Sequence, residues 1–253
     1  MNNDVTLVFS QWVDFFLYLI KKGDDFINRY SKITNKTKRE IVLLKARPCK
    51  WGKCTFCDYI DDNEIDNKKI DDINFEVLKN VTGEFGVLEV IDSASVFDLT
   101  DKSLEEIKKV VEEKNIRHLF FEAHWIYKNR LDEIRDFFKV PITFKTGIET
   151  FDNDFRERVL RKGADFKDYR EVQKYFDSPC VMVGIKGQTR EMIDRDMEII
   201  KEFSHATVNI FMNNSTDIKR DEELVKWFVE KYKYLEDDPH VDILFEITDF
   251  GVG

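Results

Sequence analysis

Short apolar runs rich in β-branched and aromatic residues alternate with longer amphipathic stretches along most of this chain. The apolar runs lie at 40–46, 86–92, 117–123, 141–149, 180–186 and 207–213, with a last one at 242–248. The amphipathic stretches lie between them, at 64–80, 103–115, 129–139, 152–162, 189–203 and 221–235. The runs predict strands, and the stretches of helical period predict helices.

Two of the predicted helices carry signals at their ends. The helix at 103–115 begins at Ser103, with Glu106 three residues later, which is a capping pattern. The helix at 152–162 stops before Gly163, a residue that favours the left-handed conformation found after helix ends. These signals support a regular alternation of strand and helix.

Such an alternation predicts an α/β fold with a parallel sheet and right-handed crossovers. Six repeats suit a partial (β/α)6 TIM-type barrel with an N-terminal helical extension and a short C-terminal strand. We expect a single domain over 1–253, with the extension at 1–38, the barrel core at 40–215, and a C-terminal helix and strand at 216–253. In barrels the chemistry lies where strands end, so candidate residues should directly follow the strands.

Charge and composition narrow the class of substrate. The chain has 50 acidic and 40 basic residues and a formal net charge of −10, which repels nucleic acid. The apolar stretch at 5–22 is interrupted by Ser10, Gln11 and Asp14 and is too short for a membrane span. We expect it to form an amphipathic helix on the domain. No signal peptide is evident, so we predict a cytoplasmic protein with reduced thiols that acts on a small molecule and binds no membrane.

Three of the four cysteines lie directly after the first predicted strand. Cys49, Cys54 and Cys57 have the spacing C-x4-C-x2-C. A structural zinc site needs four ligands, usually in paired knuckles, and no second knuckle is present. A catalytic zinc of the deaminase type would need an H-x-E signature, which is missing. Inert buried thiols are typical of scattered cysteines, and we expect that role for Cys180. An iron–sulfur cluster with one iron left open fits three clustered thiols.

This motif and the strand order resemble the radical S-adenosylmethionine (SAM) superfamily. Its members carry three clustered cysteines after the first strand of an α/β barrel, with an aromatic residue before the last, here Phe56. The first gap is one residue longer than the usual C-x3-C-x2-C. The resemblance covers residues 40 to 215. It implies a [4Fe–4S] cluster held by the three cysteines, SAM bound at the open iron, and Phe56 beside the cofactor.

The resemblance also implies a set of contacts to SAM. The segment KTGIETFDNDFRERVLRKG resembles the fourth strand of many members, so Glu149 is expected at the ribose or methionyl end and Arg161 at the methionyl carboxylate. Glu122 matches a position that binds the ribose hydroxyls. The usual Gly-Gly-Glu after the second strand is absent, and Ser93 and Ser95, or their backbone carbonyls, are expected to hold the SAM amine. Taken singly, these residues are ordinary strand-end acids and a helix-terminal cation.

Within the superfamily the chain most resembles the queuosine-salvage lyases. These enzymes cleave queuine, a 7-deazaguanine base, between its exocyclic nitrogen and the cyclopentene carbon, and leave 7-aminomethyl-7-deazaguanine. That resemblance implies a reducing partner such as flavodoxin or ferredoxin. Two alternatives stay open: a radical SAM enzyme acting on another small molecule, and a non-catalytic iron–sulfur or zinc protein.

A guanine-like edge needs a carboxylate that accepts its N–H groups, and a flat ring favours an aromatic neighbour. Side chains of these kinds, with others suited to the diol or to proton transfer, follow the predicted strands. The expected substrate contacts are Asp58, Tyr59, Lys145, Asn209 and Asn213. The sequence indicates no particular catalytic acid or base.

Overall fold

The protein is described here by a computed structural model that covers residues 28–246 and 249–252. Most of the predicted N-terminal extension, including the amphipathic helix expected at 5–22, lies outside these residues. None of the described helices is long and apolar enough to cross a membrane.

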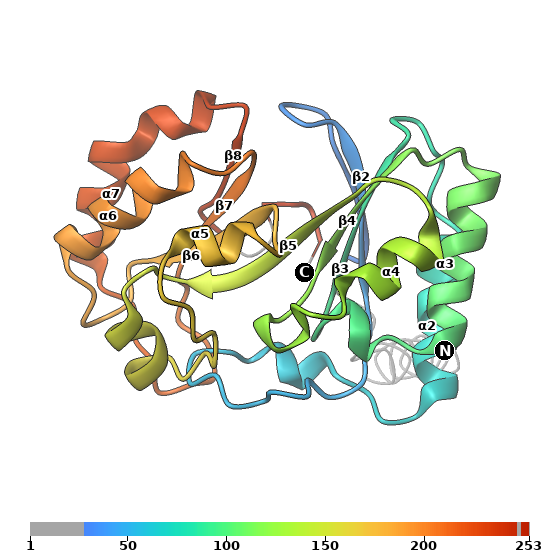
Figure 1. Ribbon diagram of the computed structural model, residues 1–253, viewed down its shortest axis with the longest axis horizontal. Coiled ribbons are helices and arrows are strands. Elements are labelled where there is room, and N and C mark those ends of the chain that lie inside the picture. Colours follow the sequence, from blue (N-terminus) through green and yellow to red (C-terminus); the bar gives the residue numbers. More distant parts are fainter. Residues whose placement is uncertain (1–27, 247–248, 253) are drawn as a thin grey trace, which may run out of the picture.

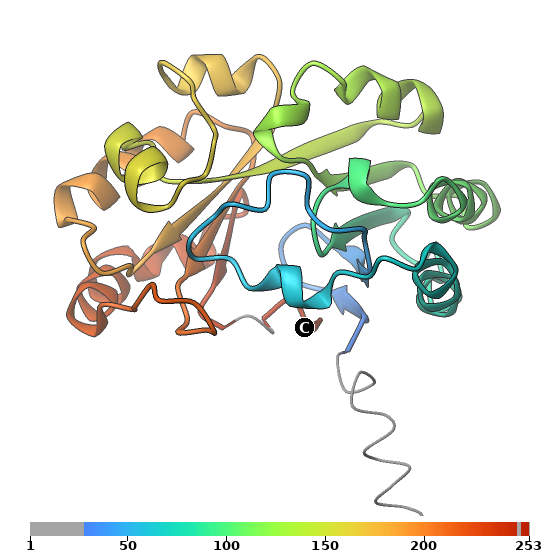
Figure 2. The same cartoon turned by 90° about the horizontal axis from the view of Figure 1, so that it is seen from below.

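Eight strands form one sheet in the order of the chain (Figure 1). They are β1 (Tyr30–Ile33), β2 (Arg39–Leu44), β3 (Val87–Asp92), β4 (His118–Glu122), β5 (Ile142–Glu149), β6 (Ser178–Val183), β7 (Ala206–Ile210) and β8 (Val241–Leu244). β1 pairs antiparallel with β2, and every later pair is parallel. The sheet curls into a partial barrel (Figure 2), which confirms the predicted α/β fold class.

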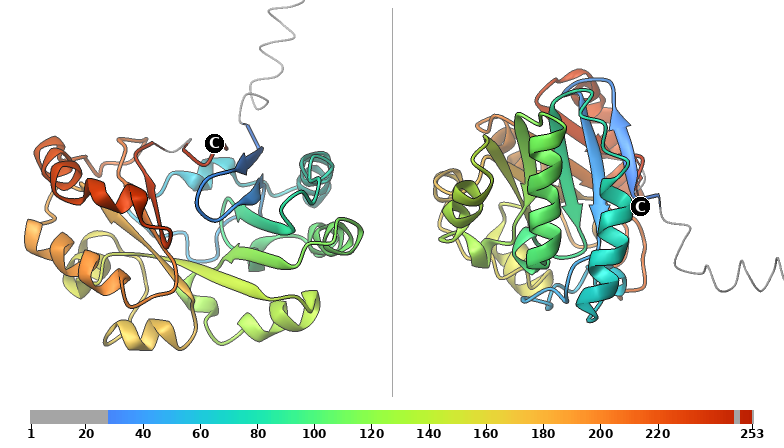
Figure 3. Two further views of the ribbon diagram at one scale, coloured as in Figure 1. Left: turned by 90° about the horizontal axis from the view of Figure 1, so that it is seen from above. Right: turned by 90° about the vertical axis from the view of Figure 1, so that its right-hand side faces the viewer.

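Helices cover the outer face of this curled sheet (Figure 3). They are α2 (Asn67–Leu78), α3 (Asp101–Glu113), α4 (Leu131–Phe138), α5 (Tyr169–Gln173), α6 (Arg190–Ile200) and α7 (Glu222–Tyr232). Short 3-10 turns lie at η1 (Tyr59–Asp62), η2 (Val96–Asp98), η3 (Trp125–Tyr127) and η5 (Lys233–Asp237), and η4 (Phe155–Val159) is a π-helical turn.

Alternate residues of β2 pack into two different apolar clusters, one on each face of the sheet. Val42 and Leu44 belong to the large core between sheet and helices. Ile41 belongs instead to a small cluster with Phe250 and Val252, which come from the C-terminal segment. Because side chains alternate along a strand, the second set lies on the inner face of the barrel. The chain's last described residues therefore pack against the inner face of the sheet.

A buried charge network joins strands across the barrel interior. The Arg39 guanidinium donates to Glu89 at 2.5 Å and to Asp242 at 2.7 Å, which links β2 to β3 and β8. Lys145 on β5 donates to the other oxygen of Glu89 at 2.5 Å. Two cations facing two carboxylates keep these groups charged although they are buried.

Three local predictions differ from the structure. β1 lies within the stretch 1–38 that was predicted to be helical, because its residues pair with β2. α3 begins earlier than predicted, and its cap is Thr100, whose hydroxyl accepts from the Ser103 N–H at 3.0 Å. Ser103 is buried and hydrogen-bonded to Asn74. The predicted helix at 152–162 is only a π-helical turn, and the α-helix between β5 and β6 is instead α5, which the sequence did not predict.

Candidate functional site

The segment 45–66, here called the cluster loop, connects β2 to α2 and carries Cys49, Cys54 and Cys57. In Figure 2 it crosses the mouth of the barrel, at the carboxyl ends of the strands. All three thiols are free and half-buried. The structure therefore places them at the end of the barrel where the chemistry of such folds is found.

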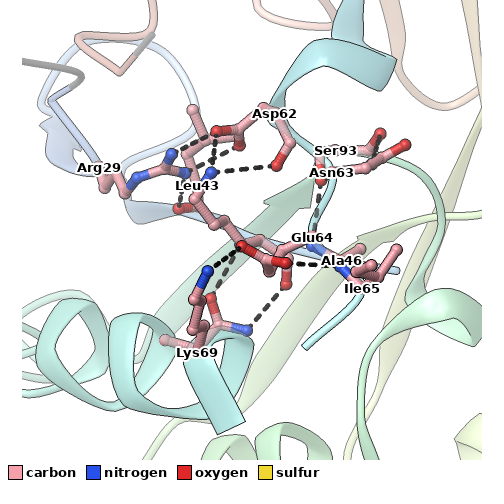
Figure 4. Close-up of polar contacts among 11 residues, drawn as sticks. Arg29, Leu43, Ala46, Asp62, Asn63, Glu64, Ile65, Lys69 and Ser93 are labelled. Atoms are coloured by element: carbon pink, nitrogen blue, oxygen red, sulfur yellow. Dashed lines mark hydrogen bonds and ion pairs between the residues drawn. The ribbon is translucent and has the colours of Figure 1, made fainter. Parts of the chain in front are cut away.

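The last part of the cluster loop is tied to the end of β3 (Figure 4). The Asn63 side-chain amide donates to the Ser93 hydroxyl at 2.9 Å and to the Ser93 carbonyl at 3.0 Å. The Ala46 N–H donates to the same hydroxyl at 3.0 Å. Arg29 holds Asp62 from the other side at 2.6 Å. Ser93 thus anchors the loop, and both of its oxygens already have partners.

The first part of the cluster loop is tied to the segment after β5. The Trp51 indole N–H donates to the Arg161 carbonyl at 2.8 Å, and Thr55 donates from its N–H to Leu160 at 3.0 Å and from its hydroxyl to Val159 at 2.7 Å. Gly163 has a φ of +64°, and a Cβ there would lie 2.2 Å from the Trp51 ring. A glycine at this position therefore allows the positive φ of the turn and leaves room for the Trp51 ring.

A third contact reaches the loop from beyond β7. The Asn214 side chain donates to the Phe56 carbonyl at 2.8 Å. Phe56 itself is buried in a cluster with Phe155 and Phe211, against which Cys54 and Cys57 pack. Asn214 was not among the predicted residues. The predicted Asn213 instead accepts from the Arg220 N–H at 2.9 Å and is exposed.

Cys54 and Cys57 lie in surroundings that favour their neutral thiol form when no metal is bound. Burial raises the pKa of Cys54 to about 12 and also raises the pKa of Cys57. The positive charge of Lys162 opposes both shifts. A bound metal supplies the remaining positive charge, since a coordinated thiol is deprotonated outright.

The spacing of ligands bears on which metal group the loop can hold. Among the described residues, no three His, Cys, Asp or Glu side chains stand close enough to share a single metal ion. A structural zinc ion draws its ligands to within about 2.0–2.3 Å of one centre. A [4Fe–4S] cube binds each thiolate on a different iron, which requires a wider spacing. Three thiols on one loop are the number of protein ligands that a [4Fe–4S] cluster with one open iron would need.

An ion pair between Glu149 and Lys162 lies beside the cysteines. Their charged atoms are 2.7 Å apart, and both residues are buried. A Cβ on Gly147 would lie 2.6 Å from the Glu149 carboxylate and 2.8 Å from the Lys162 amine, so the ion pair lies directly against this glycine. Glu149 and Arg161 both have positive φ, +65° and +52°. Strained backbone of this kind at two nearby positions is typical of functional sites.

The buried cation beside the cysteines is the residue that follows Arg161, the cation predicted to bind SAM. The Arg161 side chain is exposed and forms no ion pair with the described residues, whereas Lys162 points inward to Glu149. Lys162 was not predicted. The sequence offers little evidence that Lys162 is buried, because an Arg-Lys pair at the end of a helix is equally typical of two solvent-exposed cations.

Tyr59 and Glu122 are near enough for the charge of Glu122 to act on the Tyr59 hydroxyl. Tyr59 is 62% exposed as a residue. Partial burial of its hydroxyl and the negative charge of Glu122 raise its pKa. Burial also raises the pKa of Glu122, which forms no ion pair with any described residue. An accessible aromatic ring beside an unpaired carboxylate is the combination expected for a flat, N–H-bearing base.

Several buried polar atoms near the strand ends lack a partner in the described structure. They are Asp92 Oδ2, Ser95 Oγ, Asp98 Oδ2 and Asn209 Oδ1. Buried polar atoms are normally hydrogen-bonded, so unpaired ones at a barrel mouth suit a polar ligand. Of the two serines predicted to hold SAM, Ser95 therefore has a free hydroxyl, and Ser93 does not.

Two predicted substrate residues have other surroundings. Lys145 is fully buried and held by Glu89, so it belongs to the interior charge network. Asp58 is half-buried at the start of η1 and forms no side-chain hydrogen bond that caps this turn. Cys180 is buried, as predicted for a core thiol.

No protein-family profile matches this chain. A solved structure of a queuine lyase from Clostridium spiroforme bound to SAM and queuine is 54% identical, with a TM-score of 0.88, and the match covers 90% of this chain and 99% of that one. Streptococcus suis SuiB is 16% identical with a TM-score of 0.52, over 83% of this chain and 50% of its own. That second likeness supports the fold alone.

One curated sequence also matches. An uncharacterised protein of Methanocaldococcus jannaschii is 26% identical over 141 residues, which is 48% of this chain. The match spans only 38% of that relative's length.

Proposed function

Because this chain belongs to the queuine lyase family of the radical SAM superfamily, we propose that it cleaves queuine and leaves 7-aminomethyl-7-deazaguanine. The bond broken joins the exocyclic nitrogen to the cyclopentene carbon. The observation that carries the proposal is the 54% identity, over 90% of the chain, to a lyase bound to SAM and queuine. The three free thiols on the cluster loop support it independently.

Cys49, Cys54 and Cys57 would hold a [4Fe–4S] cluster with one open iron. When bound there, the cluster and SAM together supply a 5′-deoxyadenosyl radical that abstracts hydrogen from the substrate. The cofactors carry that step, while the protein binds, orients and excludes water. A small reducing protein of the flavodoxin or ferredoxin type would deliver the electron.

The residues around SAM would bind it through both ionic contacts and hydrogen bonds. Lys162 is the buried cation beside the thiols and suits the methionyl carboxylate. Its partner Glu149 and the nearby Glu122 suit the ribose hydroxyls and the amine. The free Ser95 hydroxyl offers a further contact. Phe56 closes the apolar side of the site.

Tyr59, Asp58 and Asn209 would contact queuine at the mouth. The exposed Tyr59 ring offers a face for the deazaguanine, and the unpaired Asn209 oxygen offers an acceptor for an N–H group. Glu122 is enclosed and has a raised pKa, so it suits both accepting a hydrogen bond and exchanging a proton.

The test is anaerobic reconstitution with iron and sulfide, followed by incubation with SAM, dithionite and queuine. We expect 5′-deoxyadenosine and 7-aminomethyl-7-deazaguanine by mass spectrometry, with deoxyadenosine formation stimulated by queuine. The variant Cys54→Ala should lose the cluster and all SAM cleavage, and Cys180→Ala is its matched control. SAM cleavage that queuine does not stimulate would reject the substrate and retain the radical enzyme.

A further inference from the structure

A patch of exposed cations covers one side of the cluster loop. Lys50, Lys53, Arg158 and Arg161 are all exposed, and Val159 adds an apolar side chain that is 39% exposed. We call these five residues the basic shoulder. The bonds from Trp51 and Thr55 to the segment 159–161 hold its two halves together.

Three of the four cations form no ion pair with the described residues, although the charge of Lys50 acts on the Asp98 carboxyl. Arg158 pairs with Asp154 at 3.0 Å. Lys53 lies 4.8 Å from the centre of the Trp51 ring, and neither it, Lys50 nor Arg161 forms an ion pair within residues 28–246 and 249–252. The chain as a whole has a net charge of −10. A local excess of positive charge therefore stands out from an acidic surface.

The position of the basic shoulder relates it to the cysteines. Lys50 follows Cys49, and Lys53 precedes Cys54, so two of its cations flank two thiols along the chain. In Figure 2 the cluster loop passes close to the segment that contains residues 155–161. A groove lined by Asp154, Phe155, Arg158, Val159 and Met192 includes two residues of the basic shoulder. Phe155 and Met192 of this groove belong to the same apolar cluster as Cys54 and Cys57.

We propose that the basic shoulder docks a small acidic protein that carries one electron at a time. The proposal rests on the proposed function, which requires a reductant at this loop. Charge complementarity favours such a partner, because opposite surface charges raise the association rate and set the orientation of an encounter.

Charge reversal tests the proposal on the reconstituted full chain. In the double variant Lys50→Glu/Lys53→Glu, we expect the rate of cluster reduction by a reduced flavodoxin to fall at least tenfold at low salt. Rapid-mixing absorbance measures that rate and requires no substrate. The rate of reduction by dithionite should stay within about twofold, because dithionite is small and does not need the docking contacts. Added salt should slow the wild type and narrow the gap.

The matched control is Lys38→Glu/Lys114→Glu. Both residues are exposed and lie before β2 and β4, at the edge of the sheet opposite the cluster loop. This control changes the net charge equally and should retain the flavodoxin rate. Equal losses with both reductants in the test variant, or equal losses in test and control variants, would overturn the proposal. Since reduction is read without queuine, failure of the lyase activity gives a separate result.

Discussion

At the scale of single residues, Lys162 is the side chain that provides positive charge inside this site. It is the buried cation beside the cysteines, and it pairs with Glu149 at 2.7 Å directly against Gly147. Its neighbour Arg161 has the same charge but faces solvent. Two consecutive residues of similar chemistry therefore have different surroundings, and only one can meet a buried anion.

Lys162→Met should weaken SAM binding by at least tenfold, or about 1.4 kcal/mol, because a buried anion loses its partner. Equilibrium dialysis of the reconstituted protein measures the affinity. Arg161→Met is the matched comparison and should have a smaller effect. If Arg161→Met gave the larger loss, the sequence-based assignment of the SAM carboxylate to Arg161 would be preferred.

Asp196 provides a test that depends on pH. Burial raises its pKa to about 7, although the Phe151 N–H donates to it at 2.8 Å. A carboxyl whose pKa is raised by folding stabilises the protein fully below its unfolded pKa and loses that contribution as pH rises through the folded value. Asp196→Asn should therefore be more stable than wild type at pH 8, with a gap that shrinks toward pH 5.5. Urea unfolding across this range measures the gap. A gap that stays constant with pH would show that Asp196 does not titrate there.

At the scale of elements, the site depends on how the cluster loop is fastened at both ends. Ser93 at the end of β3 holds both ends through Ala46 and Asn63, and the segment after β5 holds the part between them through Trp51. That segment is a π-helical turn, kept in shape by the buried Arg156, which donates to the carbonyls of Thr150 and Ala164 at 2.9 Å. The position of the thiols is therefore set by elements far away in sequence.

Gly163→Ala should loosen the cluster loop. The substitution places a Cβ against the Trp51 ring and strains a φ of +64°, which should cost about 1–3 kcal/mol. We expect less iron per chain after reconstitution, measured by a colorimetric iron assay. Gly86→Ala is the control, because Gly86 has a similar φ of +65° but faces the movable side chain of Arg117. Equal iron loss in both variants would mean that general instability, and not the Trp51 contact, is responsible.

At the scale of the whole molecule, two kinds of contact join distant parts of the barrel interior: a buried ion-pair network and a small apolar cluster. Arg39 connects β2 to β8 through Asp242, although six strand pairings separate these strands in the sheet. Ile41 packs against Phe250 and Val252 from the C-terminal segment. Both contacts join parts of the curled sheet that do not share backbone hydrogen bonds.

Arg39→Met should destabilise the fold by about 3–5 kcal/mol, because Glu89 and Asp242 lose a buried partner. The free energy of unfolding in urea measures the effect. Lys68→Met, which breaks an exposed pair with Asp72, should change the free energy little. A small effect of Arg39→Met would mean that the network relaxes or admits water when the guanidinium is lost.

The sequence by itself determined the order of the parallel strands β2 to β8, most of the helices between them, and the location of the cysteine loop after β2. Those features depend on local periodicity and on residues adjacent in the chain, which a single sequence contains. β1 was not predicted because it has only four residues, and it is the pairing with β2 that makes them a strand. The length of α3 was misjudged at its start because Ser103 is bonded by partners from α2.

Only the tertiary structure decided which polar residues meet. In the structure, Lys145 pairs with Glu89 in the barrel interior, and Asn214, not Asn213, donates to the Phe56 carbonyl. The buried cation is Lys162, whereas Arg161 is exposed. The physical reason is that the direction of a side chain at a strand end depends on bulges, positive φ angles and contacts between distant segments. None of these is expressed in the spacing of residues along the chain.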